Sequence, residues 1–178
     1  MKNFALTISL LLISIIVSCQ TKNNVMDNRT VQNFELEKYL GKWYEIARFP
    51  HSFEKGLVGV TATYSIRADG KIKVVNQGYK NSLDGKLKTA IGKAYIPNPD
   101  DPAKLKVSFF LFFYGDYYIM ELDSDYQWVL IGSSSSKYFW ILSRTPKLEI
   151  KVLEMLLMNA KNRGYDTEQL IFVLQKNN

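Results

Sequence analysis

Short segments with alternating apolar residues fill the middle of this chain, and they limit its fold more than any other feature. In "LVGVTATYSIR", residues 57–67, every second residue from Val58 to Ile66 is apolar or aromatic, and an Asp69-Gly70 turn follows. This period of two is typical of half-buried β-strands. Similar segments continue to about residue 143, and only residues 147–163 have the spacing of an amphipathic helix, which Gly164 ends.

Eight strands in succession, joined mostly by short loops and followed by one helix, predict an all-β fold. We expect an eight-stranded up-and-down antiparallel barrel with one C-terminal α-helix packed outside, which is wide enough to hold one small ligand. A β-sandwich is the alternative. A chain of 178 residues fits one such domain.

The charge and composition limit the class of partner. The net charge is +6, with lysines and arginines scattered along the chain, which indicates mild attraction to anionic surfaces but no nucleic-acid partner. An aromatic content of 13% favours β-structure and apolar binding surfaces.

The N-terminus has the pattern of an export signal. Lys2 precedes an apolar run from Phe4 to Val17, which is too short to span a bilayer. The following "IVSCQ" resembles the lipobox of bacterial lipoproteins, which implies acylation of Cys19, the only cysteine. We therefore expect a lipoprotein signal peptide at 1–18, a lipidated flexible tether at 19–33 and the folded domain at 34–178. The alternative is an ordinary signal peptide with an incidental cysteine.

Three separated motifs resemble the signature segments of the lipocalin family. They are Gly41-Lys42-Trp43, "DSDY" at 123–126, and Arg144 in "WILSRTP". The strings "YLGKWYEIARFPHSFEKGLVGVTATYS", "GKAYIP", "LKVSFF" and "YFWILSRTP" are similar to the bacterial outer-membrane, apolipoprotein D-like branch of that family. The likeness extends from Phe34 to Leu174. With Gln20 after the cysteine, it implies a lipid-anchored protein of the cell outer membrane.

The resemblance gives the first and third motifs a structural role. A barrel open at one end must be closed at the other, and Trp43 is large enough to do so, while Gly41 lets the chain pass beneath it. Arg144 can lie over the indole as a cation–π partner. The alternative is that Trp43 is only a core residue and Arg144 only a surface charge.

Strand parity predicts which side chains face the inside of the barrel. Small residues among them would leave volume, aromatic ones would form apolar wall, and polar tips would orient a ligand head group. A barrel filled by its own side chains is the alternative. The predicted lining consists of Ala47, Phe49, Val60, Ala62, Tyr64, Val74, Asn76, Ala90, Gly92, Val107, Phe109, Ile119, Ile131, Tyr138 and Trp140.

Two acidic residues do not fit this pattern. Parity places Glu45 and Glu121 inside the barrel, although a buried carboxylate needs a partner or shifts towards its neutral form. Alternatively, the outer face of the strand around Glu121 is covered, in which case a homodimer contact there is an option. By contrast, Tyr44, Ile46 and Ile141 should point outward beneath the helix.

These observations predict a membrane-anchored protein that holds a fatty acid or lysophospholipid, for lipid storage or transport in the cell envelope. Catalysis is not expected: the one histidine, His51, should be an exposed loop residue, and neither a metal-ligand cluster nor a cofactor motif is present in the sequence. Two alternatives remain open. One is an envelope enzyme that uses Glu121 or Glu45 on a lipid, and the other is an adaptor whose cavity is incidental.

Overall fold

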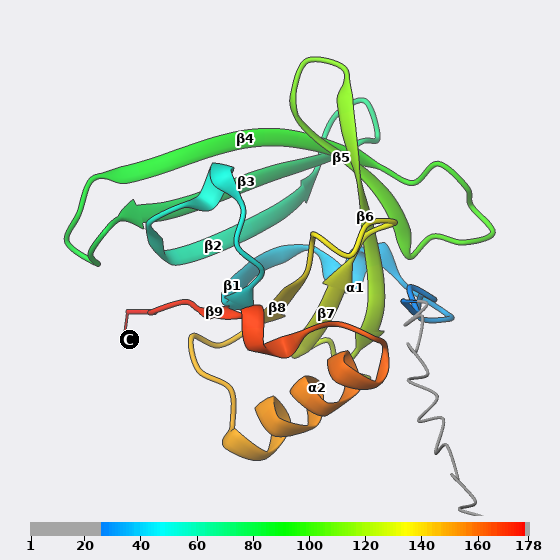
Figure 1. The fold of residues 1–178 in the computed structure, drawn as a ribbon. Coiled ribbons are helices and arrows are strands. Elements are labelled where there is room, and N and C mark those ends of the chain that lie inside the picture. The colour runs from blue at the N-terminus through cyan, green and yellow to red at the C-terminus, as the bar shows by residue number, and fades with distance from the viewer. Residues whose placement is uncertain (1–25, 177–178) are drawn as a thin grey trace, which may run out of the picture.

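A computed structural model describes residues 26–176, and it contains the predicted closed antiparallel barrel and C-terminal helix (Figure 1). The signal peptide and Cys19 lie outside the described residues. The elements in chain order are α1 (Leu36–Tyr39), β1 (Gly41–Arg48), the 3₁₀ turn η1 (Ser52–Glu54), β2 (Leu57–Ile66), β3 (Ile72–Lys80), β4 (Leu87–Tyr95), β5 (Lys104–Phe110), β6 (Phe113–Leu122), β7 (Trp128–Gly132), β8 (Trp140–Ser143), α2 (Ile150–Asn162), the 3₁₀ turn η2 (Thr167–Gln169) and β9 (Ile171–Phe172).

Each strand from β2 to β8 pairs antiparallel with the next, and β1 closes the barrel by pairing with both β8 and β2. Only the first half of β1, from Gly41 to Tyr44, pairs with β2. Its second half pairs with the short β9, where Ala47 lies opposite Phe172. The C-terminal segment therefore fills the space that opens as β1 and β2 separate.

Antiparallel connections alternate between the two ends of the barrel. The closed end carries α1 and the β2–β3, β4–β5 and β6–β7 connections. The other end, which we call the mouth, carries η1 and the β3–β4, β5–β6 and β7–β8 connections. In Figure 1 the β5–β6 hairpin projects beyond the other strands at the top of the view.

The helix α2 covers one outer face of the barrel, and two β-bulges turn extra side chains towards it. In β1 the register with β8 shifts between Glu45 and Ala47, so that both Ile46 and Ala47 pack in the cluster beneath α2. In β6 the register with β7 shifts between Ile119 and Glu121, so that both Met120 and Glu121 face α2. A bulge adds one residue to a strand and so reverses the parity beyond it.

The structure agrees with the sequence on the outward direction of Tyr44, Ile46 and Ile141, which pack in or against this cluster. It corrects the position of Glu121, which lies outside the barrel. Its carboxylate accepts hydrogen bonds from Asn159 Nδ2 and Arg163 Nε, each at 2.8 Å. The outer face of this strand is thus covered, by α2, as the second alternative of the sequence analysis allowed, and a homodimer stays a prediction.

The β5–β6 hairpin turns at Leu111–Phe112, where Leu111 has a positive φ of 48°. One boundary differs from the sequence prediction. Residues 26–33, expected to be part of the tether, are attached to the domain: Asp27 N donates to Arg163 O and Val31 N donates to Ile119 O. A shortened chain that begins at Gln20 contains all of the described residues, so it would retain the contacts of the domain. Between residues 26 and 176, we find no helix long and apolar enough to cross a membrane.

Candidate ligand-binding site

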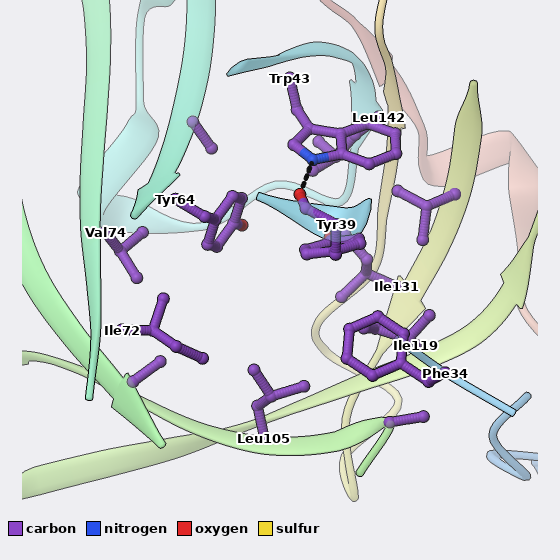
Figure 2. Packing of buried hydrophobic residues seen from close by; sticks show 14 of the residues in the cluster. Phe34, Tyr39, Trp43, Tyr64, Ile72, Val74, Leu105, Ile119, Ile131 and Leu142 are labelled. Carbon is purple, nitrogen blue, oxygen red and sulfur yellow. Dashed lines mark hydrogen bonds between the residues drawn. The ribbon is translucent and has the colours of Figure 1, made fainter. Parts of the chain in front are cut away.

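The closed end is sealed by a group of aromatic side chains that we call the barrel floor (Figure 2). Trp43 is fully buried there, and its indole Nε1 donates to Tyr39 O at 2.8 Å. The rings of Tyr39 and Trp43 lie 4.9 Å apart, with Tyr64 packed against Tyr39. Phe34, Leu105 and Ile119 are buried in the same cluster, so packed side chains close this end of the barrel.

Arg144 lies against Trp43 from outside the floor. Its guanidinium carbon is 3.8 Å from the centroid of the indole, which is cation–π geometry. The same group donates to the carbonyl oxygens of Lys38, Tyr39, Lys42 and Tyr126 at 2.8–3.2 Å. One side chain thus joins α1, the start of β1 and the β6–β7 turn.

The geometry also explains why the three sequence motifs occur together. Gly41 has a φ of +94°, and a Cβ atom on it would lie 3.4 Å from Arg144 Nη1. Tyr126, the last residue of the second motif, also has a positive φ. Its carbonyl accepts from Arg144 and its hydroxyl accepts from Glu35 N. All three motifs therefore meet at the outer side of the floor.

Above the floor, the barrel encloses a cavity of about 430 Å³ that opens at the mouth. This volume lies within the range of small-molecule binding sites. Nine of the residues predicted from parity form part of its wall: Ala62, Tyr64, Val74, Asn76, Val107, Phe109, Ile131, Tyr138 and Trp140. Whether these residues contact a ligand stays a prediction.

Six predicted lining residues lie elsewhere. Ala47 and Phe49 follow the bulge in β1 and pack outside, where the Phe49 ring contacts Phe139 and Tyr165. Val60 follows an irregularity in β2 and is buried beside Gly78. Ile119 points inward but is fully buried in the core cluster that includes the floor.

The last two, Ala90 and Gly92, belong to the part of β4 that does not pair with β5. That pairing begins only at Lys93, and Ala90 is exposed. Gly92 lies behind the ring of Phe109, which would be 2.8 Å from a Cβ atom at this position. The β4–β5 pairing therefore stops short of the mouth, where the Phe109 ring covers Gly92.

A buried charged cluster forms one side of the cavity. Glu45 and Glu54 are 3% and 5% exposed and both line the wall. Arg48, the residue that the bulge turns inward, donates to Glu45 Oε1 at 2.6 Å and to the backbone oxygens of Glu54 and Leu57. Trp140 Nε1 donates to Glu54 Oε2 at 3.2 Å. Arg48 thus pairs with the Glu45 carboxyl group and also acts on the Glu54 carboxyl group through its charge.

This arrangement favours a proton on the pair of carboxyl groups. Burial and then the nearby charge of Glu54 hold the pKa of Glu45 well above its usual range, although Arg48 acts in the opposite direction. Burial also raises the pKa of Glu54, against the hydrogen bond from Trp140 and the charge of Arg48. Glu45, which the sequence left without a partner, therefore has both a counterion and a competing acid.

His51 is not the exposed loop residue that the sequence predicted. Its side chain is 6% exposed and stacks on Phe53 with ring centroids 4.1 Å apart. Nε2 lies 3.2 Å from Glu54 Oε2, but neither ring nitrogen makes a hydrogen bond. Burial, with a smaller effect from the charge of Arg48, lowers the pKa of His51 to about 4, so the ring is neutral near pH 7.

Three tyrosine hydroxyls meet at the deep end of the cavity. Tyr117 Oη lies 2.6 Å from Tyr39 Oη and 2.7 Å from Tyr64 Oη. Burial raises the pKa of Tyr64 to about 12, and those of Tyr39 and Tyr117 are also raised by burial, so all three groups stay protonated. Of these three residues, Tyr64 and Tyr117 line the cavity.

Sequence reasoning did not find the lining residues that come from loops. These are Phe53 and Glu54 of η1 and Ser133, Ser134 and Ser135 of the β7–β8 connection. Side-chain alternation applies only within strands, so it cannot assign the direction of a loop residue. Nothing in the segment "FEKG", residues 53–56, indicates that the side chain of Glu54 is buried.

The model of the lipocalin-like domain matches residues 34–175 of this chain. The chain belongs to the lipocalin family. This lipocalin is 48% identical over 149 residues to the outer membrane lipoprotein Blc of Vibrio cholerae, covering 83% of the present chain and 86% of that protein. It is 36% identical over 155 residues to mouse apolipoprotein D, covering 82% and 79% of the two chains.

Among solved structures, insecticyanin from the tobacco hornworm Manduca sexta superposes with a TM-score of 0.67 at 21% identity, covering 85% of this chain and 86% of that one. That likeness concerns the fold alone. The bacterial relative confirms the predicted branch of the family and the localisation of this lipocalin as an outer membrane lipoprotein.

Replacing Arg144 by lysine should destabilise the barrel by about 2 kcal/mol, because an ammonium group cannot reach four carbonyl groups and stack on an indole at once. Urea unfolding of R144K against the parent chain measures this loss. R67K is the matched control, because Arg67 pairs with Asp69 on the surface of a closed-end turn. Equal losses of unfolding free energy in R144K and R67K would show that the contacts of Arg144 stabilise the barrel no more than a surface ion pair does.

The Glu45–Glu54 pair predicts a pH-dependent stability. A carboxyl whose folded pKa is raised adds stability below its ordinary pKa and loses it as the pH rises through the raised value. The E54Q variant removes one such group, so its stability relative to the parent should increase between pH 5 and pH 8. His51 acts with the opposite sign, since its lowered pKa costs stability as the pH falls, but it is common to both chains.

Urea unfolding at several pH values measures this difference. E154Q serves as the control, because Glu154 is exposed on α2. A difference between E54Q and the parent chain that does not change with pH would contradict the shared-proton interpretation.

Proposed function

We propose that this lipocalin holds a fatty acid or a lysophospholipid in its barrel cavity, and that it stores or transports such lipids for maintenance of the cell envelope. One observation carries the proposal: the cavity is closed at the floor, open at the mouth, and walled by apolar side chains such as Val74, Val107 and Ile131. Such a space accepts an acyl chain, because burial of its methylene groups is favourable.

The polar groups of the cavity lie in two places, and they support an amphiphilic ligand. Tyr64 and Tyr117 present hydroxyl groups at the deep end, while Glu45 and Glu54 lie on the side wall. A free carboxylate would be repelled by the two acids and accepted by the tyrosines. A head group with an amine would be accepted by the acids. We therefore expect the two ligand classes to place their head groups differently.

Cys19 is the proposed site of attachment to the membrane. Its position after the apolar run of residues 4–17 supports acylation, and several acyl chains on one residue would hold the protein stably. The Vibrio cholerae relative, named an outer membrane lipoprotein, supports the same assignment.

A titration tests the cavity. The chain from Gln20 onward, purified without detergent, should carry lipid that mass spectrometry identifies. After removal of this lipid it should bind palmitic acid or lysophosphatidylethanolamine with a roughly micromolar Kd. Trp140 lies on the wall and donates to Glu54, so its fluorescence should report the binding.

Two variants sharpen this test. W140F should lose most of the signal but not the binding, whereas A62W should lose the binding, because an indole at Ala62 fills the cavity. Absence of both carried lipid and measurable binding in the parent chain would contradict the proposal.

An enzyme that acts on a lipid is the second candidate, and the Glu45–Glu54 pair is the observation that favours it. Two buried carboxyl groups with raised pKa values beside a cavity are typical of acid–base sites. Glu121 is excluded from this role by its position beneath α2. Turnover of a bound lipid that disappears in E45Q and persists in E121Q would favour the enzyme over the carrier.

A further inference from the structure

The tip of the β5–β6 hairpin is a run of exposed apolar side chains that neither the fold nor the cavity explains. Phe110, Leu111, Phe112 and Phe113 are 67%, 62%, 84% and 76% exposed, and we call these four residues the aromatic tip. The rings of Phe110 and Phe113 stack at 6.2 Å on the outside of the hairpin. Four consecutive side chains of this size are rarely left in water without a partner.

The aromatic tip belongs to the mouth. Val107, Phe109 and Tyr114, at the base of the same hairpin, line the cavity, so the hairpin continues the cavity wall outward. Figure 1 shows it extending past the neighbouring strands. On the far side of the mouth, Phe53 is 60% exposed and Tyr138 is 38% exposed.

Exposed lysines gather at the mouth of the barrel. The mouth connections and the strand ends beside them carry five exposed lysines against one exposed acid, Asp84: Lys55, Lys80, Lys86, Lys88 and Lys137. The closed end has mixed charges, with acids such as Asp101 and Asp123 beside bases such as Lys104 and Arg144. An anionic surface would therefore attract the mouth more strongly than the closed end.

We propose that the mouth of the barrel docks on an anionic lipid surface, with the aromatic tip inserted among the acyl chains and the lysines of the mouth against the head groups. Aromatic and aliphatic residues bordered by lysines are the composition of segments that bind at a membrane interface. Docking in this orientation places the cavity opening against the bilayer from which a lipid would enter.

This contact is separate from the proposed acyl anchor. Thr30, close to the N-terminal start of the described chain, bonds to Asp101 of a closed-end loop. The seven residues from Cys19 to Val25 reach at most about 25 Å, whereas the ten residues of β2 alone span about 33 Å. The anchor therefore begins at the end of the barrel opposite to the aromatic tip.

Co-sedimentation with vesicles tests the proposal on the chain that begins at Gln20. The parent chain should bind vesicles of phosphatidylcholine and phosphatidylglycerol, and bind vesicles of phosphatidylcholine alone more weakly. The double variant F112S/F113S should bind at least about tenfold more weakly, since two exposed phenylalanines lose their insertion into the bilayer. K86E/K88E should lose the preference for phosphatidylglycerol.

Matched controls are available on other surfaces. M158S alters an exposed apolar residue of α2, and K151E/K161E reverses the charge of two exposed lysines of the same helix. M158S should weaken vesicle binding less than F112S/F113S does, and K151E/K161E should weaken it less than K86E/K88E does. A Trp at position 112 should be quenched by brominated lipids, and one at position 158 should not. A62W, which fills the cavity, should still dock, so that failure of lipid carriage and failure of docking are told apart.

Two results would overturn the proposal. One is equal vesicle binding by the parent chain and F112S/F113S, or no binding by either. The other is a parent chain that is dimeric in sedimentation velocity and does not bind vesicles, while F112S/F113S is monomeric. That result would assign the aromatic tip to a second copy of the chain. Because all of the substituted side chains are exposed, the thermal unfolding of every surface variant should match the parent.

Discussion

The contact of Arg144 with Trp43 is the interaction on which the rest of the barrel depends. The indole seals one end, and the guanidinium stacks on it while bonding to carbonyl groups from α1, β1 and the β6–β7 turn. The β6–β7 turn is far from α1 and β1 in the sequence, so one side chain joins distant parts of the chain. Without a closed floor, the apolar wall above it would face water from both ends.

Two bulges adapt this barrel to a single helix. Each places two consecutive side chains on the outer face, Ile46 and Ala47 in β1 and Met120 and Glu121 in β6, so that one α2 helix has enough surface to bury. The same bulge in β1 turns Arg48 into the barrel, where it becomes the counterion of Glu45. The buried charged cluster of the cavity is thus a consequence of how the outer face is packed, and both features should vary together among barrels of this type.

The two ends of the barrel differ in their surfaces. The closed end has mixed charges, whereas the mouth combines exposed lysines with exposed aromatic side chains. Inside, the tyrosine hydroxyls lie deep and the carboxyl groups lie on the side wall. A carrier that exchanges a lipid with a membrane needs such a direction, because the opening must face the bilayer with which the lipid is exchanged. The lysines of the mouth would orient the molecule as it approaches an anionic surface, and insertion of the aromatic tip would hold that orientation after contact.

The sequence by itself determined the barrel, its closing residues and about half of the cavity wall, because strand parity and the three motifs are local signals. It also determined the family. Only the tertiary structure decided where parity reverses, since a bulge depends on the pairing of β1 with β8 and of β6 with β7, which no local pattern records. For this reason Ala47, Phe49 and Glu121 were assigned to the wrong side. Burial of His51, the Glu45–Glu54 pair and the collection of scattered lysines at the mouth likewise arise from loops that meet only in the folded chain.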